Sequence, residues 1–187
     1  MSRWLVLVLF LITLRSAIDA GVRRFTYVYE STTSRAGDID VENWLTIESH
    51  TSNDRGFRAL AFRHEFEIGI TDHLQASVYV ADWQYERGEG TRYTDSALEL
   101  IYNFTNPVID PVGLAFYQEY QLGPKFFEWE SKIIAQKNFG RFVTAYNATL
   151  EAEWEREGLN EQSGELQQSL GLSYEIDPRF SRARVPP

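Results

Sequence analysis

Cysteine is absent from this 187-residue sequence. The chain therefore has no disulfide, no thiolate metal site and no lipidated N-terminal cysteine. Basic residues are also few, with Lys+Arg 18 against Asp+Glu 27. Because nucleic-acid binding needs a basic surface, this acidic balance argues against a nucleic-acid partner.

Long apolar runs are scarce as well. The longest, Trp4–Ile12, is shorter than the roughly 20 residues that a membrane-spanning helix takes. It follows Arg3 and precedes small and polar residues up to Ala20, which is the order of a secretory signal peptide. We therefore expect residues 1–20 to be removed on export, and residues 21–187 to form a single domain.

What the sequence has in place of helices is alternation. From residue 38 onward, apolar and polar side chains alternate along the chain. Tyr146, Ala148 and Leu150, for example, are separated by Asn147 and Thr149. Successive side chains of a strand point to opposite faces, whereas no window shows a helical period. The pattern predicts eight antiparallel strands over about residues 38–48, 58–70, 74–86, 94–104, 112–122, 126–137, 142–155 and 165–176.

The apolar faces of these strands favour a membrane. Between Phe142 and Trp154, twelve residue steps in a tilted strand rise roughly 31 Å, which matches an apolar band capped by aromatic residues. Candidates for such aromatic girdles are Tyr102, Phe104, Trp129, Phe142, Trp154 and Tyr174. The alternative is a secreted soluble β-sandwich or lipocalin-like barrel that binds a ligand in an apolar core.

The polar faces would point into the lumen of a barrel. Their charged candidates are Arg63, Glu65, Glu67, Glu99, Glu119, Glu128, Glu130, Lys132, Glu151, Glu153, Glu165 and Glu175. In an eight-stranded barrel, side chains just fill the interior. These charges then form either a salt-bridged plug or, because acid outnumbers base, a wet lumen that attracts cations.

Several stretches resemble one known class of protein. They are FRHEFEIGITDHLQASVYVADWQYE at residues 62–86, RRFTYVYESTT upstream, and KIIAQKNFGRFVTAYNATLEAEWE and SLGLSYEIDPRFS downstream. These stretches resemble hairpins of uncharacterised bacterial outer-membrane β-barrel proteins of porin-like or transporter-like kind. The resemblance implies an antiparallel up-and-down transmembrane barrel, with the lipid bilayer and the barrel-assembly machinery as partners. It brings no catalytic residue and no cofactor.

Two segments depart from that pattern. Such barrels usually end in a strand with a terminal aromatic residue, whereas this sequence ends RARVPP. Either the strand at 165–176 pairs with that at 38–48, or the chain is an incomplete piece of a wider barrel; we favour the second, because Asp177-Pro178 has the composition of a turn into a further strand. Phe25–Glu30 is a ninth strand-like piece, and we expect it in the lumen or along the rim.

Nothing in the sequence predicts catalysis. The three histidines, His50, His64 and His73, lack the spacing of metal ligands, and no serine can be assigned to His64 as a partner. His64 shares a face with Phe62 and Phe66, and we expect it either to pair across strands or to reflect a local error in the predicted register. The sequence thus predicts an exported protein of the bacterial outer membrane, with a structural or passive-pore role for a small solute or cation and with no catalytic, cofactor-binding or metal-binding residues.

Overall fold

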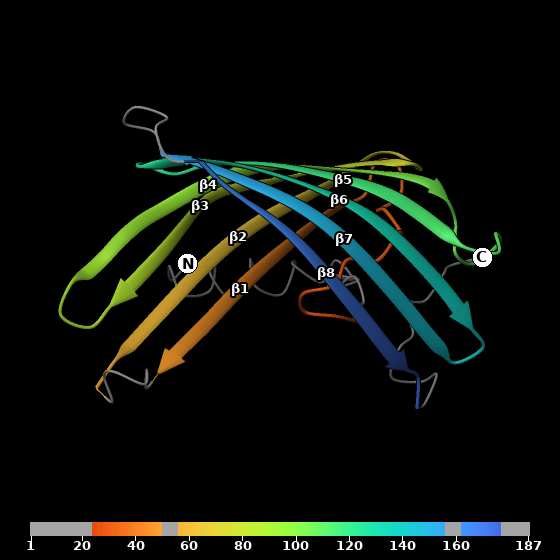
Figure 1. Cartoon of the computed structure of the whole chain (residues 1–187), viewed down its shortest axis with the longest axis horizontal. Coiled ribbons are helices and arrows are strands. Elements are labelled where there is room, and N and C mark those ends of the chain that lie inside the picture. The colour runs from red at the N-terminus through yellow and green to blue at the C-terminus, as the bar shows by residue number, and fades with distance from the viewer. Residues whose placement is uncertain (1–23, 50–55, 156–161, 177–187) are drawn as a thin grey trace, which may run out of the picture. The chain divides into compact units, whose positions relative to one another are not determined.

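Eight β-strands form one antiparallel sheet in the computed structural model, which describes residues 24–49, 56–155 and 162–176. Each strand pairs with its neighbours in sequence, so the order in the sheet is the order in the chain (Figure 1). This confirms the prediction of eight antiparallel up-and-down strands. Their bounds are β1 Ile39–Ser49, β2 Arg58–Thr71, β3 Leu74–Glu86, β4 Gly90–Thr105, β5 Gly113–Leu122, β6 Phe126–Phe139, β7 Phe142–Glu155 and β8 Gln162–Tyr174.

The hairpin between β3 and β4 is longer than predicted. The first of the two predicted strands ends at about residue 86 and the second begins at about residue 94, but β4 begins at Gly90, opposite Glu86. The prediction was wrong because Thr91 and Arg92, polar residues without an apolar alternation, continue the ladder opposite Tyr85 and Gln84. The other two long connections, at residues 50–55 and 156–161, lie outside the described part of the chain.

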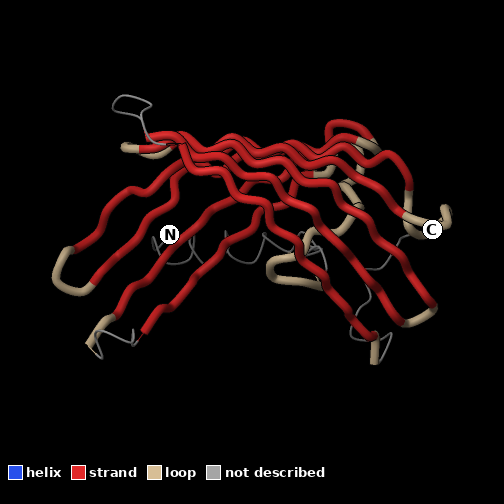
Figure 2. The backbone as a smooth tube through the Cα atoms, in the orientation of Figure 1, coloured by secondary structure: helices blue, strands red, loops and turns tan. Residues whose placement is uncertain are grey.

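The sheet is strongly curved, so it has a convex and a concave face (Figure 2). Alternation assigns the side chains: in β4, Leu98 and Phe104 are exposed on the convex face, whereas Glu99 and Asn103 are buried on the concave face. The same alternation holds along the other strands: their exposed large apolar side chains lie on the convex face, and the concave face encloses many polar side chains beside a small apolar cluster. This is the reverse of the arrangement in a soluble β-domain.

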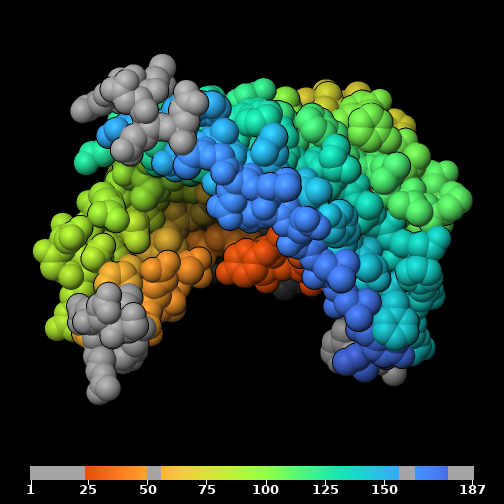
Figure 3. Space-filling view, in the orientation of Figure 1, coloured from red at the N-terminus to blue at the C-terminus, as the bar shows by residue number. Residues whose placement is uncertain are grey.

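A segment before β1 crosses the concave face. We call residues 24–38 the strap; it makes no strand of its own. In the space-filling view its red atoms lie in the hollow between β1 and β8 (Figure 3). Tyr29 of the strap packs against the buried cluster of Ile101, Ala115, Tyr117 and Ile134. The segment Phe25–Glu30 therefore lies against the concave face, which is the lumenal placement among the two we expected.

The two edges of the sheet do not meet. β1 and β8 share no ladder and no contact in the described residues, so the sheet is an open half-barrel. Closure of the strand at 165–176 on that at 38–48, one of the two expected alternatives, is absent from this part of the chain. The expected signal peptide, residues 1–20, and the C-terminal segment from Asp177 lie outside the described residues. The search for a helix long and apolar enough to cross a membrane found none among those described.

Candidate functional site: an acidic belt and the strap beside it

The strap is held chiefly through its main chain. The Asn147 side chain accepts a hydrogen bond from Tyr29 N at 2.7 Å and donates one to Tyr29 O at 3.0 Å. Gln136 Oε1 accepts from Ser31 N at 2.8 Å, and the Asn103 amide donates to Ser31 O. Side-chain amides from three strands thus bond to main-chain groups of the strap much as a neighbouring strand would.

Further bonds continue along the strap towards β2. Gln75 Oε1 accepts from Ser34 N at 2.8 Å, and Gly37 N donates to Gly69 O at 2.8 Å. The strap therefore passes from β7 and β6, over β4 and β3, to β2.

Three glycines make room for the strap, and the closest is Gly69 of β2, where a Cβ would collide with Arg35 O. A Cβ at Gly171 of β8 would lie 2.7 Å from the Phe25 ring, and a Cβ at Gly113 of β5 would collide with Ser31 Oγ. Contacts this close exclude any larger residue unless the strap shifts. The sheet surface is thus shaped to receive this segment, from β8 onward.

A row of acidic residues runs beside the strap, in register across the whole sheet. Successive ladders place one residue of each strand directly opposite the next. The row, which we call the acidic belt, consists of Asp40, Glu67, Ser77, Glu99, Glu119, Glu130, Glu151 and Glu165. Only Ser77 lacks a carboxyl group. Like charges directly opposite one another destabilise a sheet, so stability does not explain the belt.

Hydroxyl groups offset part of this cost at Glu99. The fully buried Glu99 accepts hydrogen bonds from Ser77 Oγ at 3.2 Å, Tyr79 OH at 3.0 Å and Tyr29 OH at 3.1 Å. The last bond comes from the strap. Ser34 Oγ makes a second, longer contact from the strap to the belt, 3.5 Å from Asp40 Oδ2.

A single lysine contacts the middle of the belt. Lys132 Nζ pairs with Glu130 and lies 4.5 Å from the ring centroid of Tyr29 and 4.1 Å from that of Tyr117. Tyr117 OH in turn donates to Glu119. One cation thus connects the strap, the core and the belt through ring and charge contacts.

Further carboxyl groups lie towards the end of the sheet away from the strap. Arg63 Nε lies 2.5 Å from Asp82 Oδ2, and Asp82 is directly opposite Asp95. Oxygens of Glu42, Glu65 and Glu67 lie within 4.8 Å of one another. Carboxylate oxygens at such spacing are ligands that hard cations prefer.

Eleven of the predicted lumenal charges lie on the concave face, by the alternation and register of their strands. Six of them belong to the belt: Glu67, Glu99, Glu119, Glu130, Glu151 and Glu165. Arg63, Glu65, Glu128 and Glu153 lie one or two concave positions beyond it, and Lys132 lies on the strap side. Glu175 falls after the end of β8, where its backbone N–H donates to Arg141 O at 2.9 Å.

The predicted girdle aromatics all lie on the convex face. Tyr102 and Phe104 contact each other edge to face, as Phe142 and Tyr174 do at a tilt, and both pairs lie at the strap end of the sheet. Trp129 and Trp154 both lie towards the end of the sheet away from the strap, where Trp154 stacks on Phe127. The structure therefore brings four of the six together in pairs and separates them from the two tryptophans.

Two histidines can be placed. His64 Nδ1 lies 2.7 Å from Asn43 Oδ1, on the neighbouring strand, which confirms the expected cross-strand pairing. His73 Nδ1 lies 3.1 Å from the backbone oxygen of Asn103. His50 lies outside the described residues.

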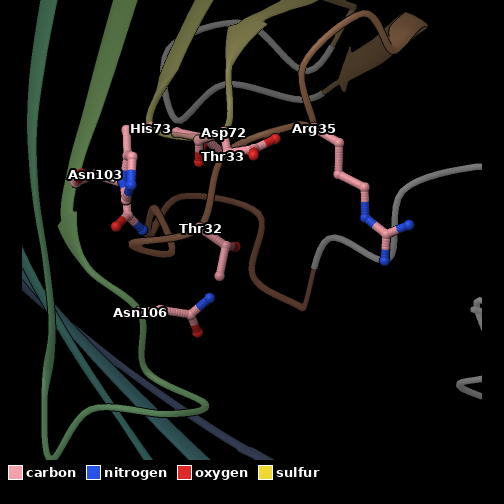
Figure 4. Close-up of a pocket in the computed structure, with 7 residues that line it drawn as sticks. All are labelled: Thr32, Thr33, Arg35, Asp72, His73, Asn103 and Asn106. Atoms are coloured by element: carbon pink, nitrogen blue, oxygen red, sulfur yellow. Dashed lines mark hydrogen bonds between the residues drawn. The ribbon is translucent and has the colours of Figure 1, made fainter.

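A polar cavity of about 400 Å³ adjoins the strap at the turn between β2 and β3. It is lined by Thr32, Thr33 and Arg35 of the strap, by Asp72 and His73 of the turn, and by Asn103 of β4 and Asn106 just after it. Figure 4 shows the Arg35 side chain extending away from the other six. Thr33 and Asp72 connect the cavity's two walls, because Thr33 Oγ1 donates to Asp72 O at 3.2 Å.

Sequence reasoning missed the residues that join the strap to the sheet. Asn147, Gln136 and Gln75 are ordinary polar positions in alternating strands, and Asp40 is one acidic residue among many. Only the register of the ladders shows that they converge. The one available signal was the strand-like pattern of Phe25–Glu30 outside the predicted set.

Comparison with known proteins gives one match. A model of a family of unknown function (DUF6662) matches residues 17–183. No curated protein and no solved structure matches the chain.

Proposed function

The chain belongs to the DUF6662 family, whose function is unknown, and we propose that it is an outer-membrane β-barrel protein that offers small cations a passive route through an acidic lumen. The proposal includes export through the secretory signal at residues 1–20 and involves no catalysis. The observation that supports it is that the convex face of the sheet is apolar and the concave face is polar, with the acidic belt on the concave face.

The apolar convex face supports a location in the membrane. Leu98, Phe104 and Leu170 are 43%, 59% and 70% exposed, on two different strands. Soluble proteins rarely expose so continuous an apolar surface, whereas the lipid-facing side of a barrel requires one. A lipocalin-like protein would instead enclose its apolar residues, and here Glu65, Glu99 and Asn147 are enclosed.

The acidic belt supports the proposal that the solutes are cations. Rings of Asp and Glu side chains make a pore selective for cations, and a low-dielectric wall strengthens their field. In the described strands, Arg63 and Lys132 are the cationic side chains within two concave positions of the belt, and each is already paired with a carboxylate. Anions would therefore meet repulsion along the concave face.

A barrel in lipid needs partners for both free edges, because unpaired backbone groups cost several kcal/mol each in hydrocarbon. Side chains alone fill a closed eight-stranded barrel, whereas this hollow also holds the strap. We therefore favour a wider barrel, in which further strands lie between β8 and β1, over direct closure of β8 on β1.

Membrane fractionation tests the proposal. We expect the expressed protein in the outer-membrane fraction, extracted only by detergent, with an electrophoretic mobility that changes on heating as folded barrels do. Recovery from the aqueous fraction without detergent, and a mobility that heating leaves unchanged, would refute it.

A further inference from the structure

We propose that the strap is a resident plug, bound by its main chain to the side-chain amides of Asn147, Gln136, Asn103 and Gln75, and that it closes the lumen to cations until it is released. This inference rests on the proposed function, since a plug closes only a barrel that has a lumen. It adds the regulation of the route, and it depends on different residues from those of the membrane face.

The strap lies where it would block a solute. It crosses the concave face from Gly171 in β8 to Gly69 in β2, transverse to the strands. Any solute that moves along the strands on this face meets it. Ser31, at its middle, is fully buried.

The bonds that hold the strap are of a kind that can exchange. Asn147 and Gln136 bind the strap through uncharged side-chain amide groups. Their partners are backbone N–H and C=O groups, and every residue except proline has both. Each such bond replaces a bond to water and is individually weak, so a few of them hold a segment that still exchanges. The strap makes no strand of its own, so no continuous ladder of backbone bonds holds it to the sheet.

The strap also contacts the acidic belt. Tyr29 OH donates to Glu99, and Ser34 Oγ lies near Asp40, so two strap residues occupy hydrogen-bonding positions on belt carboxylates. Lys132 lies over the Tyr29 ring and beside Glu130. While the strap is seated, it makes hydrogen-bonding contacts with Glu99 and Asp40. Release of the strap uncovers them.

A thiol-protection experiment on the full chain tests binding. The native chain has no cysteine, so Ser31→Cys supplies a single thiol of nearly the same size at the buried centre of the strap. We expect an aqueous maleimide to react slowly with it. Tyr27→Cys, at a position that is 85% exposed, reports full access of the reagent.

The Ser31→Cys background then receives Asn147→Leu with Gln136→Leu. These changes remove amides that hold Tyr29 and Ser31, and we expect the maleimide rate to rise by at least about tenfold. The matched control is Gln118→Leu. That amide faces the convex side and bonds to Glu130 O and Ser131 within the sheet, so the thiol in the strap stays protected. If the double variant does not fold, each single substitution is expected to give a smaller rise.

Conductance in planar bilayers tests closure. Where the further strands proposed between β8 and β1 complete the barrel, we expect the unmodified chain and Gln118→Leu to show little current, and the double variant to show a cation current. Fast labelling of the Ser31→Cys thiol in the otherwise unmodified chain, or protection that survives the double substitution, would overturn the binding. Faster labelling without added current would overturn the closure. Because labelling does not require a membrane, it separates failure of the plug from failure of the proposed function, which fractionation decides alone.

Discussion

At the scale of single residues, Glu99 connects three parts of the molecule. Its carboxylate accepts from Ser77, Tyr79 and Tyr29, which belong to the same hairpin and to the strap. A buried hydroxyl that loses its acceptor costs about 1–3 kcal/mol. Glu99 therefore orders its surroundings even though it stands in a row of like charges.

We predict that Glu99→Leu lowers the free energy of unfolding by about 3 kcal/mol or more, because it leaves several hydroxyl groups without an acceptor. Glu99→Gln keeps a carbonyl oxygen and costs less. Urea titration of the folded protein, followed by tyrosine and tryptophan fluorescence, measures both. Equal losses in the two variants would contradict this account of Glu99.

Arg63 gives a second prediction at this scale. Its guanidinium pairs with the buried Asp82, which is directly opposite Asp95. Removing the cation in Arg63→Met leaves two carboxylates facing each other, and we expect a loss of about 3 kcal/mol in the same titration. The double variant Arg63→Met, Asp82→Asn should recover most of that loss. A double variant no more stable than the single one would show that the pair contributes little.

At the scale of elements, the strap and β8 are fitted to each other. Gly171 leaves space that the Phe25 ring occupies, whereas a Cβ at Gly164, in the same strand, would meet only Glu151 O at 4.0 Å. The two glycines therefore offer a matched comparison.

We predict that Gly171→Val displaces the start of the strap, and that Gly164→Val leaves it in place. The expected result is faster proteolysis within residues 24–38 for the first variant alone, at least severalfold, because an overpacked contact is relieved by moving the less constrained partner. Limited digestion with chymotrypsin, which cuts after Phe25, Tyr27 and Tyr29, provides the readout. Identical digestion of both variants would argue against the fit.

At the scale of the whole molecule, the sheet separates an apolar convex face from an acidic concave one. In β7, Leu150 is exposed on the convex face and Thr149 is buried on the concave face. The two positions are adjacent in sequence, so any difference between them reports the environment of the face and not the depth along the strand.

We predict that nitroxide labels distinguish them in proteoliposomes. A label at Leu150→Cys should be relaxed mainly by oxygen, which concentrates in lipid, and a label at Thr149→Cys mainly by a water-soluble nickel reagent. The absence of native cysteine makes each label unique. Equal access of the nickel reagent at both positions would count against the membrane.

Ion selectivity belongs to the same scale. In the background with a released strap, Asn147→Leu with Gln136→Leu, we expect Glu151→Gln with Glu165→Gln to lower the cation-to-anion permeability ratio by about twofold or more, because two belt charges are removed. The reversal potential in a salt gradient measures this ratio. Neutralising Glu48, in β1 and outside the belt, is the control and should change it less.

Sequence alone determined the strands and the chemistry of their faces, because the alternation of side chains along a strand is a local property. It placed β3 and β7 to the residue, and it assigned Glu99 and Phe104 to opposite faces. The register between strands is not local. It depends on how each ladder aligns with the next, so only the tertiary structure arranged Asp40 to Glu165 as one belt and showed the sheet open between β1 and β8. The place of the strap was decided in the same way, since its partners Asn147 and Gln136 lie more than a hundred residues away from it and no local pattern records such a contact.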